Sequence, residues 1–438
     1  MKHKLLAATV KSIGTKTQIE NFYPLTTKFD REEKAFSLAE VTGLLVSRIS
    51  NTVAKDFDLI SFKEQCLKAF RESMDDVEYI DMIEKIYFEG DKLTIDSLLV
   101  YQTIKSTNNS KNVFKLFIQL LDINVLDIDF TSDCNFMDKI VIEELQKYLK
   151  TQNPDESTSS YLPFIDNVFN KDLQSLSTNK HYFKQNIEKF LEIYFFIYTS
   201  QLALNLIPNR NALSLPESRE LYFILTQEKA STERTKVSER GCSHLFDSVK
   251  YIFPYMSLLT SISNSVEEKN LRLYEILNKL EETQESIDAI DSFAMKFREA
   301  KQLSTDDVKS SISREEALFN LLDLSFDQFK EGCKVNRKRA FNQYESAFKR
   351  QISKQFIVNR KRAGNVLVLD QDTILFITNL IVGSGEKIRF QHLIEEFNKR
   401  GIYFDAKTRN ELIILFDRVG NIERKSDSGD SVYVKATI

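Results

Sequence analysis

The run GIYFDAKTRNELIILFDRVGNIERKSDSGDSVYVKATI, Gly401 to Ile438, decides the fold that the sequence predicts for the last part of the chain. Asp405 stands before a segment whose apolar residues recur every three or four positions, so it predicts an N-cap and a helix with one buried side. Two strand-like segments then flank the turn-rich Ser426–Asp430. This pattern predicts a β-hairpin directly after the helix.

The residues before this run complete a recognisable order of elements. The apolar segment DTILFITNLIVG, Asp372 to Gly383, predicts a short helix with a capping acid before it and a glycine after it. An extended piece, EKIRF, precedes a second helix, QHLIEEFNKRG, whose last glycine predicts the stop. Helix, strand, helix, helix and hairpin is the layout of a winged helix, a helix-turn-helix variant. We therefore predict a C-terminal winged-helix module.

The composition of the whole chain favours helices. Hydrophobic residues make up 42% of the 438 residues, and there are only 11 glycines and 6 prolines, which is atypical of a turn-rich all-β fold. The predicted class is mainly α, with a multi-helical body and the C-terminal winged-helix (α+β) module. The predicted segments are an N-terminal helical domain (1–150), a polar linker (151–160), a second helical region with long helices (160–329), a basic amphipathic helix (330–364) and the winged-helix domain (365–438).

Two patterns in the second helical region predict particular elements. The segment ELYFILTQE, Glu220 to Glu228, is apolar between polar flanks and predicts a strand. Leucines at heptad-like spacing between Val266 and Arg298 predict a long helix of a bundle or helical hairpin. A coiled coil is the less favoured alternative, because Gln284 interrupts the seam.

Several features indicate a cytoplasmic protein. The apolar segment Phe190–Pro208 approaches the length that crosses a bilayer, but it contains Glu192 and other polar residues, so we predict a buried core helix and no membrane contact. The apolar run near Met1 is too short for a signal peptide. The four cysteines lie far apart without a CxxC pair, which predicts neither a disulfide framework nor a zinc knuckle.

Basic charge is concentrated in one segment of an otherwise acidic chain. Between Lys330 and Arg362 there are eleven Lys or Arg and two acids, although the formal net charge of the chain is −4. The hexamer VNRKRA occurs twice there, from Val335 and from Val358. An aromatic stripe between the copies predicts one amphipathic helix with a copy at each end. Phosphates are the commonest partner of such charge, so we interpret the copies as phosphate clamps; docking on an acidic protein is the alternative.

The third helix and the wing of the C-terminal module add further cations, but acids nearly balance them. We therefore expect phosphate contact there rather than direct reading of bases. The predicted nucleic-acid-binding residues are Arg337, Lys338, Arg339, Lys349, Arg350, Arg360, Lys361, Arg362, Lys407, Arg409, Arg424 and Lys425.

No motif predicts an enzyme. The segment Val382–Arg389 has the wrong spacing for a phosphate-binding loop. Asp405-Ala406-Lys407 matches the Asp/Glu-x-Lys part of a nuclease motif, but helix capping explains the aspartate. Cys242 and His244 would supply only two of the four ligands that a structural zinc needs. We predict no catalytic residues, no metal or other cofactor, and no small-molecule substrate.

The C-terminal run, together with LVLDQDTILFITNLIVGSGEKIRF before it, resembles the C-terminal part of the DptG family, the G subunits of bacterial DNA phosphorothioation-dependent restriction systems. SDSGD followed by YVK is the most specific element. The resemblance implies a role beside DptF-like and DptH-like subunits in attacking DNA that lacks the sulfur-modified backbone, and it brings no catalytic residues. A stand-alone winged-helix transcriptional regulator and a purely architectural subunit are the alternatives.

Overall fold

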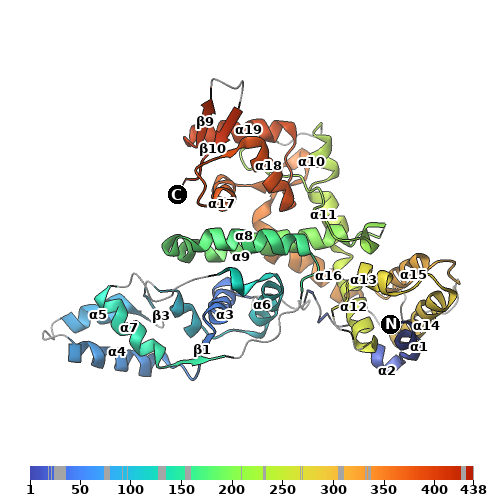
Figure 1. Cartoon of the computed structure of the whole chain (residues 1–438), viewed down its shortest axis with the longest axis horizontal. Coiled ribbons are helices and arrows are strands. Elements are labelled where there is room, and N and C mark those ends of the chain that lie inside the picture. The colour runs from blue at the N-terminus through green and yellow to red at the C-terminus, as the bar shows by residue number, and fades with distance from the viewer. Residues whose placement is uncertain are drawn as a thin grey trace. The chain divides into compact units, whose positions relative to one another are not determined.

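The structure is a computed structural model, and it describes all of the chain except 18, 21, 24–35, 74–78, 91, 96, 127–134, 153–158, 209, 230–232, 267, 269, 304–309, 331, 332, 334–336, 426–430 and 438. It is mainly helical with a few small sheets (Figure 1), which confirms the predicted class at that level. The chain divides into two compact units. Unit 1 comprises Met1–Ala35, Thr158–Ser175 and Ile193–Ile438, and unit 2 comprises Phe36–Ser157 and Leu176–Glu192. The division therefore does not follow chain order.

Part of unit 2 is built from amphipathic helices around an apolar cluster. Phe62, Cys66 and Phe70 share one face of a helix and are fully buried against Ile83. The close approach of two elements requires a glycine at Gly43, because a Cβ there would lie 2.2 Å from a backbone carbonyl oxygen. The main elements are α3 (Leu38–Ser50), β1 (Thr52–Ala54), α4 (Leu59–Ser73), α5 (Ile80–Tyr87), β2 (Phe88–Glu89), β3 (Lys92–Leu93), α6 (Asn108–Leu120), α7 (Phe136–Gln146) and β4 (Leu149–Thr151), with β1 antiparallel to β4.

The long helix α9 crosses the division between the units: its residues up to Glu192 belong to unit 2, and those from Ile193 onward belong to unit 1. Its side chains from Phe190 onward are buried except that of Glu192, which confirms the predicted core helix. In the described residues, no helix is long and apolar enough to cross a membrane. The α-helices up to residue 327 that lie wholly or partly in unit 1 are α1 (Lys2–Ala7), α2 (Val10–Ile13), α8 (Pro163–Ser177), α9 (Lys180–Asn205), α10 (Thr235–Glu239), α11 (Cys242–Val249), α12 (Ile252–Val266), α13 (Leu273–Lys279), α14 (Gln284–Lys301) and α15 (Arg314–Asp327).

The single long helix predicted over Val266–Arg298 is wrong. The backbone leaves the helical conformation at Leu280, which is extended and buried. Thr283 then starts α14, because its side chain accepts a hydrogen bond from the backbone N–H of Ser286. A new N-cap inside an apolar repeat divides the segment into α13 and α14.

The continuous basic helix predicted over 330–364 is also wrong. Helix α16 (Lys338–Ala347) passes into a π-helical turn (Phe348–Ile352), a 3-10 turn (Lys354–Phe356) and then strand β6 (Ile357–Asn359). β-Branched residues favour strands, and Ile357 and Val358 pair antiparallel with β7 (Asn365–Leu369). The second copy of the hexamer therefore lies in a hairpin and not at a helix end.

A three-stranded sheet brings together distant parts of unit 1 in the order β5-β7-β6. Strand β5 (Ile224–Leu225) lies inside the predicted strand segment and runs parallel to β7, with Ile224 opposite Val368. The sequence thus predicted this strand, but its partner comes from far along the chain.

The C-terminal elements follow the order that the sequence predicts. They are α17 (Gln371–Val382), β8 (Ile388–Arg389), α18 (Phe390–Lys399), α19 (Ala406–Arg418), β9 (Ile422–Lys425) and β10 (Ser431–Val434), and the sheet order is β8-β10-β9. Asp405 caps α19 as predicted, because its carboxylate accepts from the backbone N–H of Thr408 at 2.9 Å. Gly401 follows α18 with φ +76°, in the left-handed region that favours glycine. The predicted turn Ser426–Asp430 lies outside the described residues.

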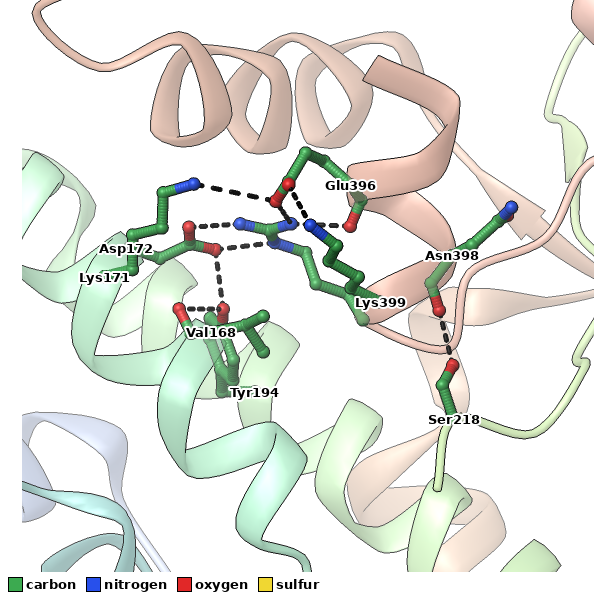
Figure 2. A network of polar contacts seen from close by, with 9 residues as sticks. Val168, Lys171, Asp172, Tyr194, Ser218, Glu396, Asn398 and Lys399 are labelled. Carbon is green, nitrogen blue, oxygen red and sulfur yellow. Dashed lines mark hydrogen bonds and ion pairs between the residues drawn. The ribbon is translucent and has the colours of Figure 1, made fainter. Parts of the chain in front are cut away.

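A buried ion pair attaches these elements to the rest of unit 1. The guanidinium of Arg400 donates to both carboxylate oxygens of Asp172 on α8, one of them at 2.8 Å, and to Glu396 (Figure 2). The Tyr194 hydroxyl donates to the same carboxylate at 2.6 Å. Burial disfavours the charged form of Arg400, but the attraction of Asp172 outweighs this and raises the pKa of the guanidinium.

Replacing Arg400 with methionine is expected to lower the free energy of unfolding by about 3–5 kcal/mol, because the fully buried carboxylate of Asp172 would lose its cation. Urea unfolding of the full chain measures the effect. Lys68→Ala is the control, because its exposed pair with Glu72, at 3.8 Å, should contribute less than about 1 kcal/mol. Equal stability of the two variants would contradict the anchoring role of Arg400.

Candidate nucleic-acid interface

The polar side of α16 and the π-helical turn forms a basic face. Its residues follow helical spacing, and the opposite side of the same segment is buried through Tyr344, Phe348 and Ile352. The face surrounds a shallow depression of about 630 Å³. All of the residues that line it are polar: Lys338, Arg339, Asn342, Gln343, Ser346, Lys349 and Arg350. Four cations with amide and hydroxyl groups between them are the donors that a phosphate backbone requires.

Arg337 is not part of this face, although the sequence predicted it as a phosphate ligand. It is buried, and it donates to the backbone carbonyl of Lys301 at 3.0 Å and to that of Thr15 at 3.3 Å. Burial lowers the pKa of its guanidinium. Lys301 is buried beside it and donates to the carbonyls of Gly14 and Lys16. Burial, and then the charge of Arg337, lowers the pKa of Lys301 to about 8. The two cations therefore bind the N-terminal segment.

The second copy of the hexamer forms the turn between β6 and β7. Arg360 is half-buried and donates to the backbone carbonyl of Thr226. Lys361 and Arg362 are exposed in the turn. Lys361 has φ +53°, and its N–H donates to the side chain of Asn359 at 3.0 Å. In each copy the first arginine thus bonds to backbone carbonyls, and the Lys-Arg pair after it lies nearer the solvent.

Phe246 on α11 connects the basic face with this turn. Its ring centroid lies 5.9 Å from that of Phe348 in the π-helical turn and 5.8 Å from the ammonium nitrogen of Lys349. Phe246 also lines a cavity together with Ala363 and Gly364 of the turn. The folded chain therefore places the π-helical turn at the end of α16 and the second copy of the hexamer beside the same aromatic side chain, without a continuous helix. We call the following residues the basic surface: Lys338, Arg339, Lys349, Arg350, Lys361 and Arg362.

Sequence reasoning missed Phe246. It is one aromatic among 33 phenylalanines, and no repeat or charge pattern distinguishes it. Phe246 can be recognised only in the folded chain, where it contacts Phe348 of the π-helical turn and lines a cavity with residues of β7.

The predicted cations of α19 and the wing have a different setting. Lys407 is exposed, whereas the Arg409 guanidinium donates to the carbonyl of Phe404 at 3.1 Å. Arg424 lies 3.9 Å from Asp417. The side chain of Lys425 is outside the described part of the chain.

The N-terminal end of α19 is covered by a buried polar network. Arg234 donates to both oxygens of the Asp405 cap, to Thr408, and at 2.8 Å to Glu228. Asp405 has a lowered pKa; burial opposes ionisation, but the bonds from Arg234 and Thr408 outweigh it. Base-reading helices usually present their N-terminal residues to the major groove, so this network disfavours such a role for α19.

Comparison with models of known protein families gives no match, and comparison with curated proteins gives none either. Among the residues that the structure describes, no group of three His, Cys, Asp or Glu could hold a metal ion. The basic surface is the candidate functional site in the described part of the chain.

Arg337→Gln is expected to destabilise the chain by about 1–3 kcal/mol, because the shorter side chain leaves buried carbonyl groups without a donor. The matched variant Arg339→Gln changes the same charge at an exposed position and should alter stability by less than about 0.5 kcal/mol. Thermal melts of both variants test this. Equal melting temperatures would contradict the structural role of Arg337.

Proposed function

We propose that this protein is a non-catalytic, DNA-engaging subunit of a phosphorothioation-dependent DNA restriction complex, related to the DptG family and acting in the cytoplasm beside DptF-like and DptH-like subunits. The observation that carries the proposal is the basic surface on a chain with a net charge of −4: four of its cations line one depression, and the other two precede the residues of the β6–β7 turn that line a cavity with Phe246. The resemblance of the C-terminal sequence supplies the restriction context.

The C-terminal elements support a winged-helix assignment within this proposal. Their order of helix, strand, helix, helix and hairpin, and the sheet order β8-β10-β9, are those expected of such a module. Its acids nearly balance its bases, and Arg234 covers the N-terminal end of α19. In this proposal the module therefore positions the protein on its partners, while the basic surface binds phosphates.

The rival function is a stand-alone transcriptional regulator. A regulator of this class reads bases with the N-terminal part of its third helix and binds two half-sites as a dimer. The Arg234 network on Asp405 argues against that mode. A sequence-specific footprint with two half-sites would support the regulator instead.

Removing four cations of the basic surface should weaken DNA binding to the same extent for all DNA sequences. The variant changes Lys338, Arg339, Lys349 and Arg350 to glutamine, and the slope of log affinity against log salt should fall by about 0.9 for each phosphate that the variant no longer binds. The control changes four exposed lysines of unit 2 to glutamine: Lys68, Lys111, Lys139 and Lys150. Both variants lose four charges. Identical slopes for the two variants would contradict a phosphate-binding role for this surface.

Membership of a complex predicts recovery of partners from the native host. A tagged chain purified from a nuclease-treated lysate should retain DptF-like and DptH-like subunits, because nuclease removes associations that depend on DNA alone. Mass spectrometry of the eluate identifies the partners. Recovery of the chain without either subunit would contradict the restriction-complex proposal but would leave DNA binding by the basic surface intact.

A further inference from the structure

A cavity lies directly beside the basic surface. It has a volume of about 360 Å³, and residues of α10, α11, the β6–β7 turn and β7 line it. Its apolar lining includes Val237, Phe246 and Val366, and its polar lining includes Ser238, Ser243 and Asn365. Ser238 and Ser243 are exposed, so they lie toward the mouth of the cavity.

The lining suits a flat, heteroaromatic group. The Phe246 ring offers a surface for stacking, and stacking of a base on an aromatic side chain is a common, sequence-tolerant way to bind single strands. The two serine hydroxyls and the Asn365 amide offer hydrogen bonds to the edge of such a group. The Asn365 oxygen already accepts from Asn359 at 2.9 Å, which leaves the amide NH₂ group as its donor.

Cations of the basic surface stand at the edge of this cavity. The ammonium nitrogen of Lys349 lies 5.8 Å from the centroid of Phe246. Lys361 and Arg362 immediately precede Ala363 and Gly364, which form part of the wall. A base inside the cavity would therefore place its own phosphates near these three cations.

We propose that this cavity accepts one unstacked nucleobase, so that the basic surface prefers single-stranded DNA to an intact duplex. The inference deepens the proposed function and depends on it. An intact duplex would have to extrude a base at the cost of its pairing and stacking, whereas a base in a single strand is already free to enter. The partner is accordingly a displaced strand, a gap or a frayed end.

The experiment compares three fluorescent ligands with the full-length chain at one salt concentration. They are a 12-nucleotide oligothymidine strand, an abasic strand with the same number of phosphates, and a duplex of the same length. The wild-type chain should bind the oligothymidine about tenfold more tightly than the abasic strand, a typical effect of one base stack. Phe246→Ala should remove most of this difference.

A second variant guards against a packing defect, because Phe246 also contacts Phe348. Ser243→Phe fills the cavity from an exposed position without removing a packed side chain. Thr235→Phe adds the same bulk at an exposed residue of α10 outside the lining and is the control. Ser243→Phe should lose the preference for the oligothymidine, and Thr235→Phe should keep it.

The two proposals fail in distinguishable ways. Equal affinity of the wild-type chain for all three ligands would overturn the base cavity and leave the basic surface as a phosphate site. A preference for the oligothymidine that survives Ser243→Phe would also overturn the cavity. Absence of binding to every ligand would overturn both proposals.

Discussion

The buried pair of Arg400 and Asp172 is the constraint on which the C-terminal half of unit 1 depends. The two residues are 228 positions apart, and both are almost completely buried. Such a pair is tolerated only when every polar atom has a partner; Tyr194 and Glu396 supply the additional ones. The C-terminal elements are therefore attached to α8 and α9 and do not form an independent module on a linker. The network of Arg234 and Asp405 fixes them at a second position, at the start of α19.

The features of the fold that depend on local sequence signals could be predicted from the sequence. The caps at Asp370 and Asp405 and the glycines at 383 and 401 mark helix boundaries within a few residues, so the order of the C-terminal elements could be derived from them. The extent of the basic helix could not be derived. The apolar stripe of Phe348, Ile352 and Phe356 has helical spacing, and only pairing with β7 turns Ile357 into a strand residue.

The cations of the two VNRKRA copies are also alike in sequence but differ in their surroundings in the fold. Composition gives each copy three equivalent cations. In the fold, Arg337 and Arg360 donate to backbone carbonyls that other segments supply, at Lys301, Thr15 and Thr226. The number of cations in the interface could thus be read from the sequence only as an upper limit. The Lys-Arg pair that follows the first arginine of each copy is what contributes to the charge of the basic surface.

The parallel pairing of β5 with β7 has a consequence for synthesis of the chain. Ile224 leaves the ribosome long before its partner Val368. At 5–20 residues per second, the interval is roughly 7–30 s. During this time β5 and the apolar side chains around it have no sheet to join, and unpaired apolar strands are prone to aggregate. Unit 2, in contrast, is fully synthesised before that interval begins, because its last residue is Glu192. Nascent unit 1 is therefore the part of the chain that a chaperone would have to protect.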